Sequence, residues 1–476
     1  MKKVLLFLIG CFFLNSGTSQ VIIYPDSLLE YEQSGTSLCY NNSSLMAGNA
    51  IGDRYLIYFN SDTIFLNVKQ SGTWTRKIAY TGSNIKLATL ALNSDTVWIC
   101  WKESAFIKAR YSANKGNTWS NVLNVSAAGN VSAPSMYASS NGKIHFVWHN
   151  ESASDSTVSH NVYYNGGFLP SPNTLSSYGF KASWPSVTAI GDTVLCSWKE
   201  THGVAKIYFA CSFNGGQAGS WSPSGFTDGP NTAKDPNLSY AFDGNTNTHY
   251  VYLVYDGNQN IYLQRSTDFG SNWTPSAIIS NTAKNSQFAK VESNNSGFVG
   301  VSWEHRTVVS LFDDTKKDVG FVYSTNWANT GSFGTDSLAY THNPFGSTLT
   351  SLNKIDSANF YLVWLSHDTV LNRNVIYERH IGFSTTSGIN DATEDQTDIL
   401  IYPTPTAGSI IIESKDPLIN IGWIKIYDVL GKEIAEKTMA GSIETIDVSF
   451  LQNGVYFIKT MSNTTQTHKI IVQNKN

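Results

Sequence analysis

The chain has 476 residues, with 36 acidic and 32 basic side chains and a formal net charge of −4. That length exceeds one ordinary domain, and no long basic run suggests nucleic-acid binding. Hydrophobic residues make up 41% and charged residues 14%, which excludes a disordered chain. The 13% aromatic content and the many Asn, Ser and Gly turn residues favour an all-β protein.

The N-terminus has the pattern of a secretory signal. Two lysines precede an apolar stretch from Val4 to Leu14, and small residues follow at Gly17 and Ser19. We therefore predict that residues 1–19 are a signal peptide, cleaved before Gln20. No later run is apolar and long enough to span a membrane.

Five cysteines occur in the chain. Cys11 resembles a lipoprotein cysteine, but it lies inside the apolar stretch, so we do not expect lipidation. The mature chain keeps Cys39, Cys100, Cys196 and Cys211, whose spacing fits no metal motif. We predict small buried core residues rather than disulfides, and we expect neither a bound metal nor a cofactor.

A short apolar strand that ends in an aromatic residue recurs through the middle of the chain. The closing aromatics lie between 43 residues (Tyr58 to Trp101) and 61 residues (Trp303 to Trp364) apart, which is typical of propeller blades. These anchor residues are Tyr58, Trp101, Trp148, Trp198, Tyr255, Trp303 and Trp364.

A second landmark follows some anchors, with the pattern S-x-D-x-G-x-x-W. The segment 266–273 matches it fully, and 112–119 has Asn in place of Asp. We expect a tight hairpin in which the Asp or Asn binds backbone amides and the Gly takes a positive φ. The residues of the two hairpins are Ser112, Asn114, Gly116, Trp119, Ser266, Asp268, Gly270 and Trp273.

These segments resemble the Asp box of the sialidase (BNR-repeat) superfamily, over about residues 40–385. The resemblance implies a β-propeller from residue 20 to 383, and the seven anchors favour seven blades. The last blade lacks an outer strand, which Val21 to Tyr24 could supply. Six blades remain an alternative if the Tyr58 repeat is not a true blade.

A polar and acidic segment, residues 384–399, is predicted to be a linker. Residues 400–476 then show alternating strands with turn glycines, which predicts a small β-sandwich. Its segments, from Tyr402-Pro403 to Gly454-Val455-Tyr456, resemble the type A sorting domain of type IX secretion cargo, with Thr404 where Asn is usual. The resemblance implies that the type IX secretion machinery exports the protein to the cell surface or beyond it. A generic carbohydrate-binding sandwich is the alternative.

In propellers of this family, the second strand of each blade ends at the ligand-binding face, and the Asp-box hairpins lie on the opposite face. We call the ligand-binding face the mouth of the propeller. The polar residues that follow the anchors should line it: Lys102, Glu103, His149, Asn150, Glu151, Lys199, Glu200, His202, Asp256, Glu304, His305, Arg306, Ser366, His367 and Asp368. The catalytic candidates are Glu304, His305, Glu200, His149 and Tyr255. The ligand-binding candidates are Arg306, Arg373, Glu103 and His202. Solvated loop ends would explain the same composition.

Several functions fit these residues. A sialidase needs three arginines on the sialate carboxylate, and only Arg306 and Arg373 fall near the mouth, which argues against that activity. A polysaccharide lyase could use a histidine base with Tyr255 as acid, and a glycoside hydrolase could use carboxylates such as Glu304. A non-catalytic glycan-binding propeller and a structural or adhesive surface protein fit the same residues. We expect an extracellular glycan as partner.

Overall fold

The computed structural model describes residues 20–33, 37–38, 44–49, 51–152, 155–222, 225–282, 285–306, 317–329, 331–333, 348–368, 373–384, 399–402, 406, 408–414, 422–428, 432–438, 441–461 and 465–473. The chain divides into two compact units, Met1–Ser387 and Gly388–Asn476. Every named element in the described ranges is a β-strand, so none is a helix that could span a membrane. The predicted signal peptide lies outside these ranges, and so does most of the predicted linker.

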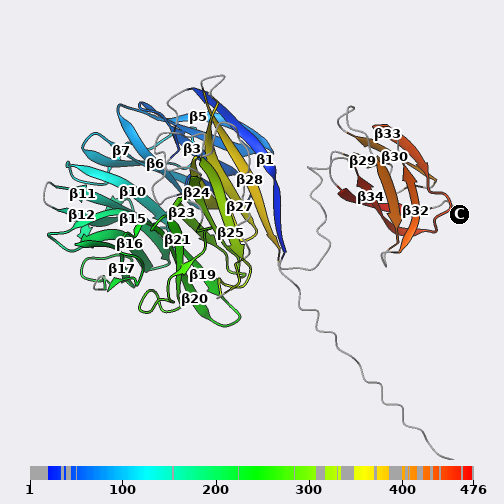
Figure 1. The fold of residues 1–476 in the computed structure, drawn as a ribbon. Coiled ribbons are helices and arrows are strands. Elements are labelled where there is room, and N and C mark those ends of the chain that lie inside the picture. Colours follow the sequence, from blue (N-terminus) through cyan, green and yellow to red (C-terminus); the bar gives the residue numbers. More distant parts are fainter. Residues whose placement is uncertain are drawn as a thin grey trace, which may run out of the picture. The chain divides into compact units, whose positions relative to one another are not determined.

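The first unit consists of antiparallel meanders that follow one another along the chain (Figure 1). The first is β2 (Met46–Gly48), β3 (Arg54–Phe59), β4 (Thr63–Gln70) and β5 (Thr73–Thr81). The second is β6 (Ile85–Asn93), β7 (Thr96–Glu103), β8 (Phe106–Ser112) and β9 (Leu123–Asn124).

A nine-stranded sheet contains the next two meanders, which share a single parallel pair between Ser156 and Lys181. Its first part is β10 (Val131–Ala138), β11 (Ile144–Glu151), β12 (Ser156–Tyr164), β13 (Gly167–Phe168) and β14 (Asn173–Thr174). Its second part is β15 (Lys181–Ile190), β16 (Thr193–His202), β17 (Val204–Ser212) and β18 (Gly225–Phe226).

Three further sheets complete the unit. One is β19 (Lys234–Asp243), β20 (Thr248–Gly257), β21 (Asn260–Ser266) and β22 (Ala277–Ile278). The next is β23 (Asn285–Ser293), β24 (Val299–Arg306) and β25 (Lys317–Ser324). The last has the order β26 (Thr348–Lys354), β27 (Asn359–Asp368), β28 (Arg373–Ser384) and β1 (Gln20–Gln33).

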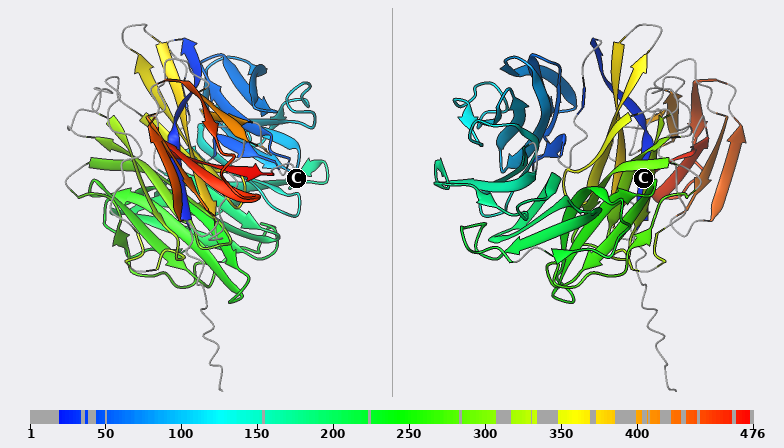
Figure 2. Two further views of the ribbon diagram at one scale, coloured as in Figure 1. Left: turned by 90° about the vertical axis from the view of Figure 1, so that its right-hand side faces the viewer. Right: turned by 60° about the vertical axis from the view of Figure 1, so that its left-hand side comes forward.

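The N-terminal strand pairs with the last sheet, as the sequence predicted. Val21 lies opposite Phe383 and Ile23 opposite Ile381, so β1 is the outer strand beside β28 (Figures 1 and 2). The inner strands contact one another in the order β2, β6, β10, β15, β19, β23 and β26, and β26 contacts β2. The first unit is therefore all-β and propeller-like.

The first and last sheets are joined by buried polar contacts as well as apolar packing. Nη1 of Arg54 lies 3.0 Å from Oε2 of Glu378, and the guanidinium lies 4.0 Å from the centre of the Tyr361 ring. Oδ1 of Asn353 accepts hydrogen bonds from the amides of Leu45 and Met46. These contacts connect sheets that lie about 300 residues apart in the chain.

The predicted anchors form the core of the first unit. Each of the seven aromatic anchors is at most 1% exposed. Cys100, Cys196 and Cys211 are also buried and unbridged, and Cys39 lies outside the described residues. Burial of these large rings between neighbouring sheets accounts for their regular recurrence in the sequence.

A β-bulge recurs in six of the described inner strands, one to three residues after the strand begins. One residue of each bulge has a positive φ between 47° and 57°, although none of them is glycine. These residues are Leu87, Ala133, Trp184, Asp235, Phe288 and Leu349. Such backbone strain persists only where the surrounding structure enforces it, and it is common at functional sites.

The second unit has two antiparallel sheets. One is β29 (Ile399–Tyr402), β30 (Ser409–Ser414) and β33 (Ile443–Asp447). The other has the order β32 (Glu433–Thr438), β31 (Trp423–Tyr427), β34 (Gly454–Met461) and β35 (Thr465–Val472). Ile410 and Ile446 from one sheet and Ile424 and Ile458 from the other share a single core, so the unit is a β-sandwich.

Candidate functional site

The residues that follow each anchor alternate between the two faces of their sheet. The residue directly after the anchor lies opposite the inner-strand residue that precedes the bulge; Lys199, for example, pairs with Ser183. The equivalent residues in the other sheets are Lys102, His149, Asp256 and Glu304. Because successive strand residues point to opposite faces, the next residues, including Glu200 and His305, face the other way. The polar residues that were predicted to form one ring therefore divide into two sets, which lie on opposite faces of their sheets.

Glu200 and His305 belong to the set that faces the anchors. The indole Nε1 of Trp198 donates to Oε2 of Glu200 at 2.7 Å, and Nε1 of Trp303 donates to Nδ1 of His305 at 3.1 Å. Both acceptors are completely buried. They provide the hydrogen bond that a buried indole N–H requires. This placement favours a structural role for two of the predicted catalytic residues.

Glu103 is held in a similar network. Its carboxylate accepts from Nζ of Lys108 at 2.6 Å, from Oη of Tyr80 at 2.9 Å and from the amide of Ser83 at 2.9 Å. Burial acts to raise the pKa of Glu103, but these hydrogen bonds hold it below the ordinary value. Glu103 thus joins the first two meanders as a carboxylate.

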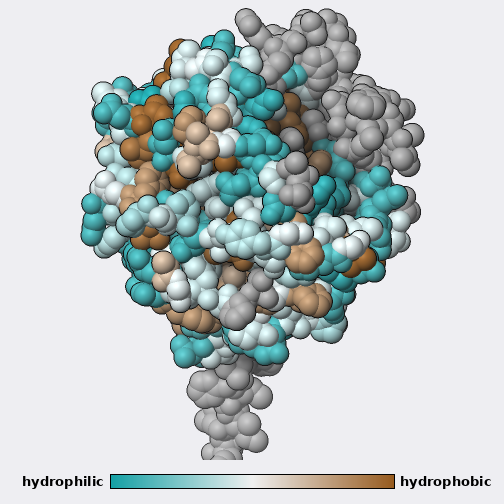
Figure 3. Space-filling view, turned by 90° about the vertical axis from the view of Figure 1, so that its left-hand side faces the viewer, coloured by the Kyte–Doolittle hydropathy of each residue, from teal (hydrophilic) through white to brown (hydrophobic). Residues whose placement is uncertain are grey.

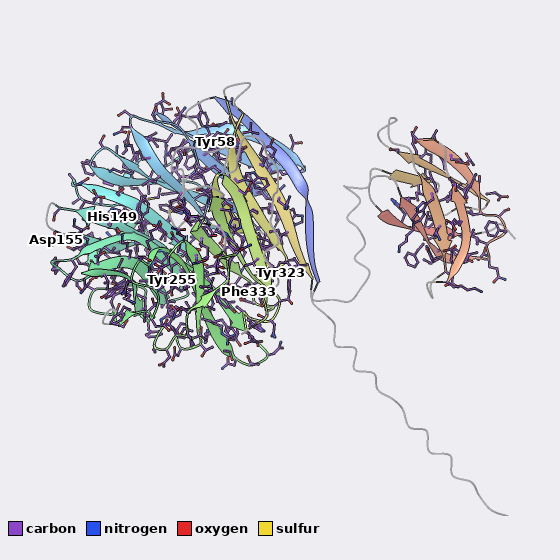
Figure 4. All side chains as sticks on the ribbon, in the orientation of Figure 1. Tyr58, His149, Asp155, Tyr255, Tyr323 and Phe333 are labelled. Atoms are coloured by element: carbon purple, nitrogen blue, oxygen red, sulfur yellow. The ribbon has the colours of Figure 1, made fainter. Side chains whose placement is uncertain are left out.

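Tyr255 does not reach the mouth. It is fully buried, its hydroxyl donates to Oε1 of Gln264 at 3.1 Å, and burial raises its pKa. Figure 4 labels Tyr255 on the sheet of β20 and His149 on the sheet of β11. The structure therefore does not bring the predicted acid and base together.

His149 and Glu304 belong to the other set, which meets the bulges of the following sheets. The amide of Trp184 donates to Nδ1 of His149 at 3.4 Å, and the amide of Leu349 donates to Oε2 of Glu304 at 3.4 Å. Both amides come from positive-φ bulge residues. The bulges therefore turn their backbone toward the side chains that follow the anchors.

His149 is a neutral imidazole at neutral pH. Burial lowers its pKa, although Glu151, whose Oε1 lies 2.9 Å from Nε2 of His149, acts in the opposite direction. With Nε2 donating to Glu151 and Nδ1 accepting from Trp184, both ring nitrogens are engaged. Abstraction of a substrate proton by His149 would require one of these hydrogen bonds to open.

A cavity of about 300 Å³ opens beside these residues. We call it the mouth cavity; it is lined by Trp184, Lys199, Lys234, Asp235 and Phe288, which come from three consecutive meanders. Trp184, Asp235 and Phe288 are bulge residues, so the strained backbone presents three of the five lining side chains. No group of three His, Cys, Asp or Glu residues in the described ranges is arranged to hold a metal ion.

The two lysines of the mouth cavity differ in their surroundings. Nζ of Lys234 lies 3.0 Å from Asp256 and 3.3 Å from Asp235 and sits over the Phe288 ring. Burial and the neighbouring Asp235 raise the pKa of Asp256 well above its usual value, and the paired Lys234 acts in the opposite direction. Lys199 is half-buried, and none of the described carboxylates lies within ion-pair distance of it. Lys199 is therefore the lysine of this cavity that has no ion-pair partner among the described carboxylates.

The remaining ligand-binding candidates are only partly described. Nε2 of His202 lies 2.5 Å from Oε1 of Glu200, and its side chain is 31% exposed at the end of β16. The side chains of Arg306 and Arg373 lie outside the described residues. Their backbones end β24 and begin β28.

The two Asp-box-like hairpins lie at the other ends of the strands. Ser266 Oγ donates to Asp268 Oδ1 at 2.8 Å and accepts from the amide of Gly270, and Asp268 Oδ1 accepts from the amide of Asn272 at 2.8 Å. In the other hairpin, Asn114 Oδ1 accepts from the amide of Thr118 at 2.8 Å. Gly116 and Gly270 have positive φ, next to Trp119 and Trp273. Both hairpins are closed by their own hydrogen bonds.

Comparison with known proteins identifies the second unit. Residues 400–473 match the family described as the secretion system C-terminal sorting domain. This part of the chain is a type IX secretion sorting domain. The protein is therefore exported to the cell surface or released from the cell, as the sequence predicted. No curated protein sequence matches the chain.

Solved structures resemble the first unit. A polysaccharide lyase, an ulvan lyase bound to a chain of glucuronate and sulfated rhamnose, is 11% identical, with a TM-score of 0.51 over 74% of this chain and 95% of that one. A protein of unknown function from Dyadobacter fermentans is 10% identical, with a TM-score of 0.44 over 76% and 99%. A neuraminidase-like protein of A/flat-faced bat/Peru is 10% identical, with a TM-score of 0.41 over 66% and 95%. At these identities the likeness concerns the fold alone.

Proposed function

We propose that this exported protein binds an anionic extracellular glycan in the mouth cavity. The observation that carries the proposal is Lys199, a half-buried cation in the lining of the mouth cavity, with none of the described carboxylates within ion-pair distance. Taking a cation out of water without a counter-charge costs free energy, and a ligand carboxylate or sulfate would recover it. The rings of Trp184 and Phe288 offer flat apolar surfaces for the faces of a sugar.

The proposed scaffold is a seven-bladed propeller in which β1 closes the seventh blade. The order of inner-strand contacts, which returns from β26 to β2, and the Arg54–Glu378 ion pair between the last and first sheets support seven blades. In such a ring the strand ends of every blade converge on one mouth, so one ligand can contact several blades.

Binding is better supported than cleavage. A lyase or hydrolase needs an acid and a base that face the same bond, yet Tyr255 and Glu200 are buried in hydrogen bonds and both His149 nitrogens are engaged. A sialidase would need an arginine triad, whereas lysines line the mouth cavity. The experiment below distinguishes binding from the alternative functions, which are a lyase, a hydrolase and a purely adhesive protein.

The experiment is a titration of the full mature chain with uronate-containing and sulfated polysaccharides, ulvan among them, and with neutral ones. Lys199→Ala should weaken binding of the anionic polymers by about tenfold or more, because a charge-assisted contact is lost. Lys143→Ala is the matched control, because this lysine lies at the opposite strand ends and pairs with the exposed Asp192. Chain shortening during the titration would establish an enzyme. Equal binding by both variants, or no binding to any glycan, would refute the proposal.

A further inference from the structure

A row of aromatic rings lies on one face of the β15–β18 meander. The ring centres of Phe180 and His202 are 3.5 Å apart with their planes 10° from parallel, and those of His202 and Tyr208 are 5.2 Å apart at 16°. The Phe226 ring continues the row, 5.7 Å from Tyr208. We call these four residues the aromatic ledge. The first three rings are stacked face to face and present their edges, and the exposed Phe226 ring, tilted by 42° to Tyr208, ends the row.

The aromatic ledge is open to solvent. Phe226 is 62% exposed and Phe180 36%, and the neighbouring Tyr178 is 75% exposed. Figure 3 shows one face of the molecule, on which brown hydrophobic patches interrupt the hydrophilic surface. Scattered apolar residues are normal on a surface, but a connected row of exposed rings marks an interaction site.

The aromatic ledge is also held rigid. Glu200 anchors the His202 imidazole at 2.5 Å and is itself fixed by the indole of Trp198. Tyr208 stacks against the buried Trp198 at 6.4 Å. A surface that is ordered before the ligand arrives loses little entropy on binding.

The aromatic ledge begins close to the mouth cavity. Lys199 and His202 are three residues apart on β16, a distance of about 10 Å along a strand. Their side chains point to opposite faces of the sheet, so a ligand that reaches both must cross the open ends of β15 and β16. Those ends carry the exposed Lys181, Phe180 and the partly exposed His202.

We propose that the aromatic ledge is a second sugar-binding subsite, which takes a further sugar of the chain held at Lys199. The inference rests on the proposed function, because the aromatic ledge would bind another part of the same glycan chain that Lys199 holds. The apolar C–H face of a pyranose ring packs on an exposed aromatic ring such as Phe226, and this contact does not depend on the charge of the sugar. The aromatic ledge therefore selects long chains over short ones, while the mouth cavity selects their charge.

The test compares oligosaccharides of increasing length from ulvan and alginate on the full mature chain. Phe226→Ala and Tyr178→Ala should weaken binding of the longest oligosaccharides about three- to tenfold and leave the shortest unchanged. Phe213→Ala is the control, because Phe213 is also 63% exposed but follows β17 at the opposite strand end. Both substituted residues, Phe226 and Tyr178, are largely exposed, so these variants should fold.

The outcomes separate the two proposals. If Lys199→Ala weakens binding at every length and the Phe226 and Tyr178 variants bind like the wild type, the ledge subsite is refuted and the mouth cavity stands. If those variants weaken binding of long chains and Lys199→Ala does not, the mouth cavity is refuted and the aromatic ledge stands. If no oligosaccharide binds, both are refuted.

Discussion

The indole Nε1 of Trp198 lies 2.7 Å from Oε2 of Glu200, and neither side chain is exposed to solvent. Glu200→Ala should lower the free energy of unfolding by about 1–3 kcal/mol, because a buried N–H loses its acceptor. Glu200→Gln keeps an acceptor oxygen and should cost less. Urea unfolding of both variants, with glycan binding measured alongside, checks the prediction. If Glu200→Gln keeps its full stability but no longer binds glycan, Glu200 has a role in ligand binding and the prediction is wrong.

The Asp268 hairpin should contribute to stability alone. Asp268→Ala loses the hydrogen bonds to Ser266 and Asn272, which should cost about 1–2 kcal/mol. Asn114→Ala in the equivalent hairpin is the matched comparison and should behave alike. Thermal unfolding measures both effects. A variant that keeps its full stability but no longer binds glycan would contradict this role.

Two buried histidines should make the protein sensitive to acid. Nδ1 of His145 and Nε2 of His160 are 3.1 Å apart; burial lowers the pKa of His145 to about 3 and that of His160 well below its usual value. Both rings stay neutral in the fold, while the unfolded chain takes up protons below about pH 6.5. The unfolded state then binds more protons, so stability falls as the pH drops from about 6.5 toward 3.

His145→Gln removes one of these titrating groups. Between pH 7 and pH 5 it should lose roughly 2 kcal/mol less stability than the wild type, the linkage contribution of one histidine. Urea unfolding of both proteins at the two pH values gives the difference. An identical pH dependence would show that the buried pair does not titrate in this way.

The sorting domain should be separable from the propeller-like unit. Each unit has its own core, so deleting residues 400–476 should leave the first unit folded but retained inside the cell. Cell fractionation, with a melting curve of the retained protein, checks both parts. Normal export of the truncated chain would contradict the role of the domain.

The architecture could be predicted from the sequence because large aromatic residues, which are buried in the fold, recur at regular intervals along the chain. The anchors, the closing strand β1 and the second sandwich all follow from regular apolar patterns and turn residues. The alternation after the anchors was also readable, since neighbouring residues such as Lys199 and Glu200 must face opposite ways in a strand. That rule alone would have separated Glu200 and His305 from the mouth.

The mouth cavity was not predictable in the same way. Trp184, Asp235 and Phe288 lie in bulges with positive φ, where no glycine marks the turn. Trp184 and Phe288 are ordinary strand residues by composition, and it is the register shift against the second strand that turns all three residues toward the cavity. The pairing of Lys234 with Asp256, and the lack of such a partner for Lys199 among the described carboxylates, depend on that geometry.

The most direct test of the account is a crystal structure of the mature chain with a bound anionic oligosaccharide. We expect a carboxylate or sulfate oxygen within hydrogen-bond distance of Lys199 Nζ and a sugar ring against Trp184 or Phe288. A ligand bound at the Asp268 hairpin face, with the mouth cavity occupied only by solvent, would contradict the account.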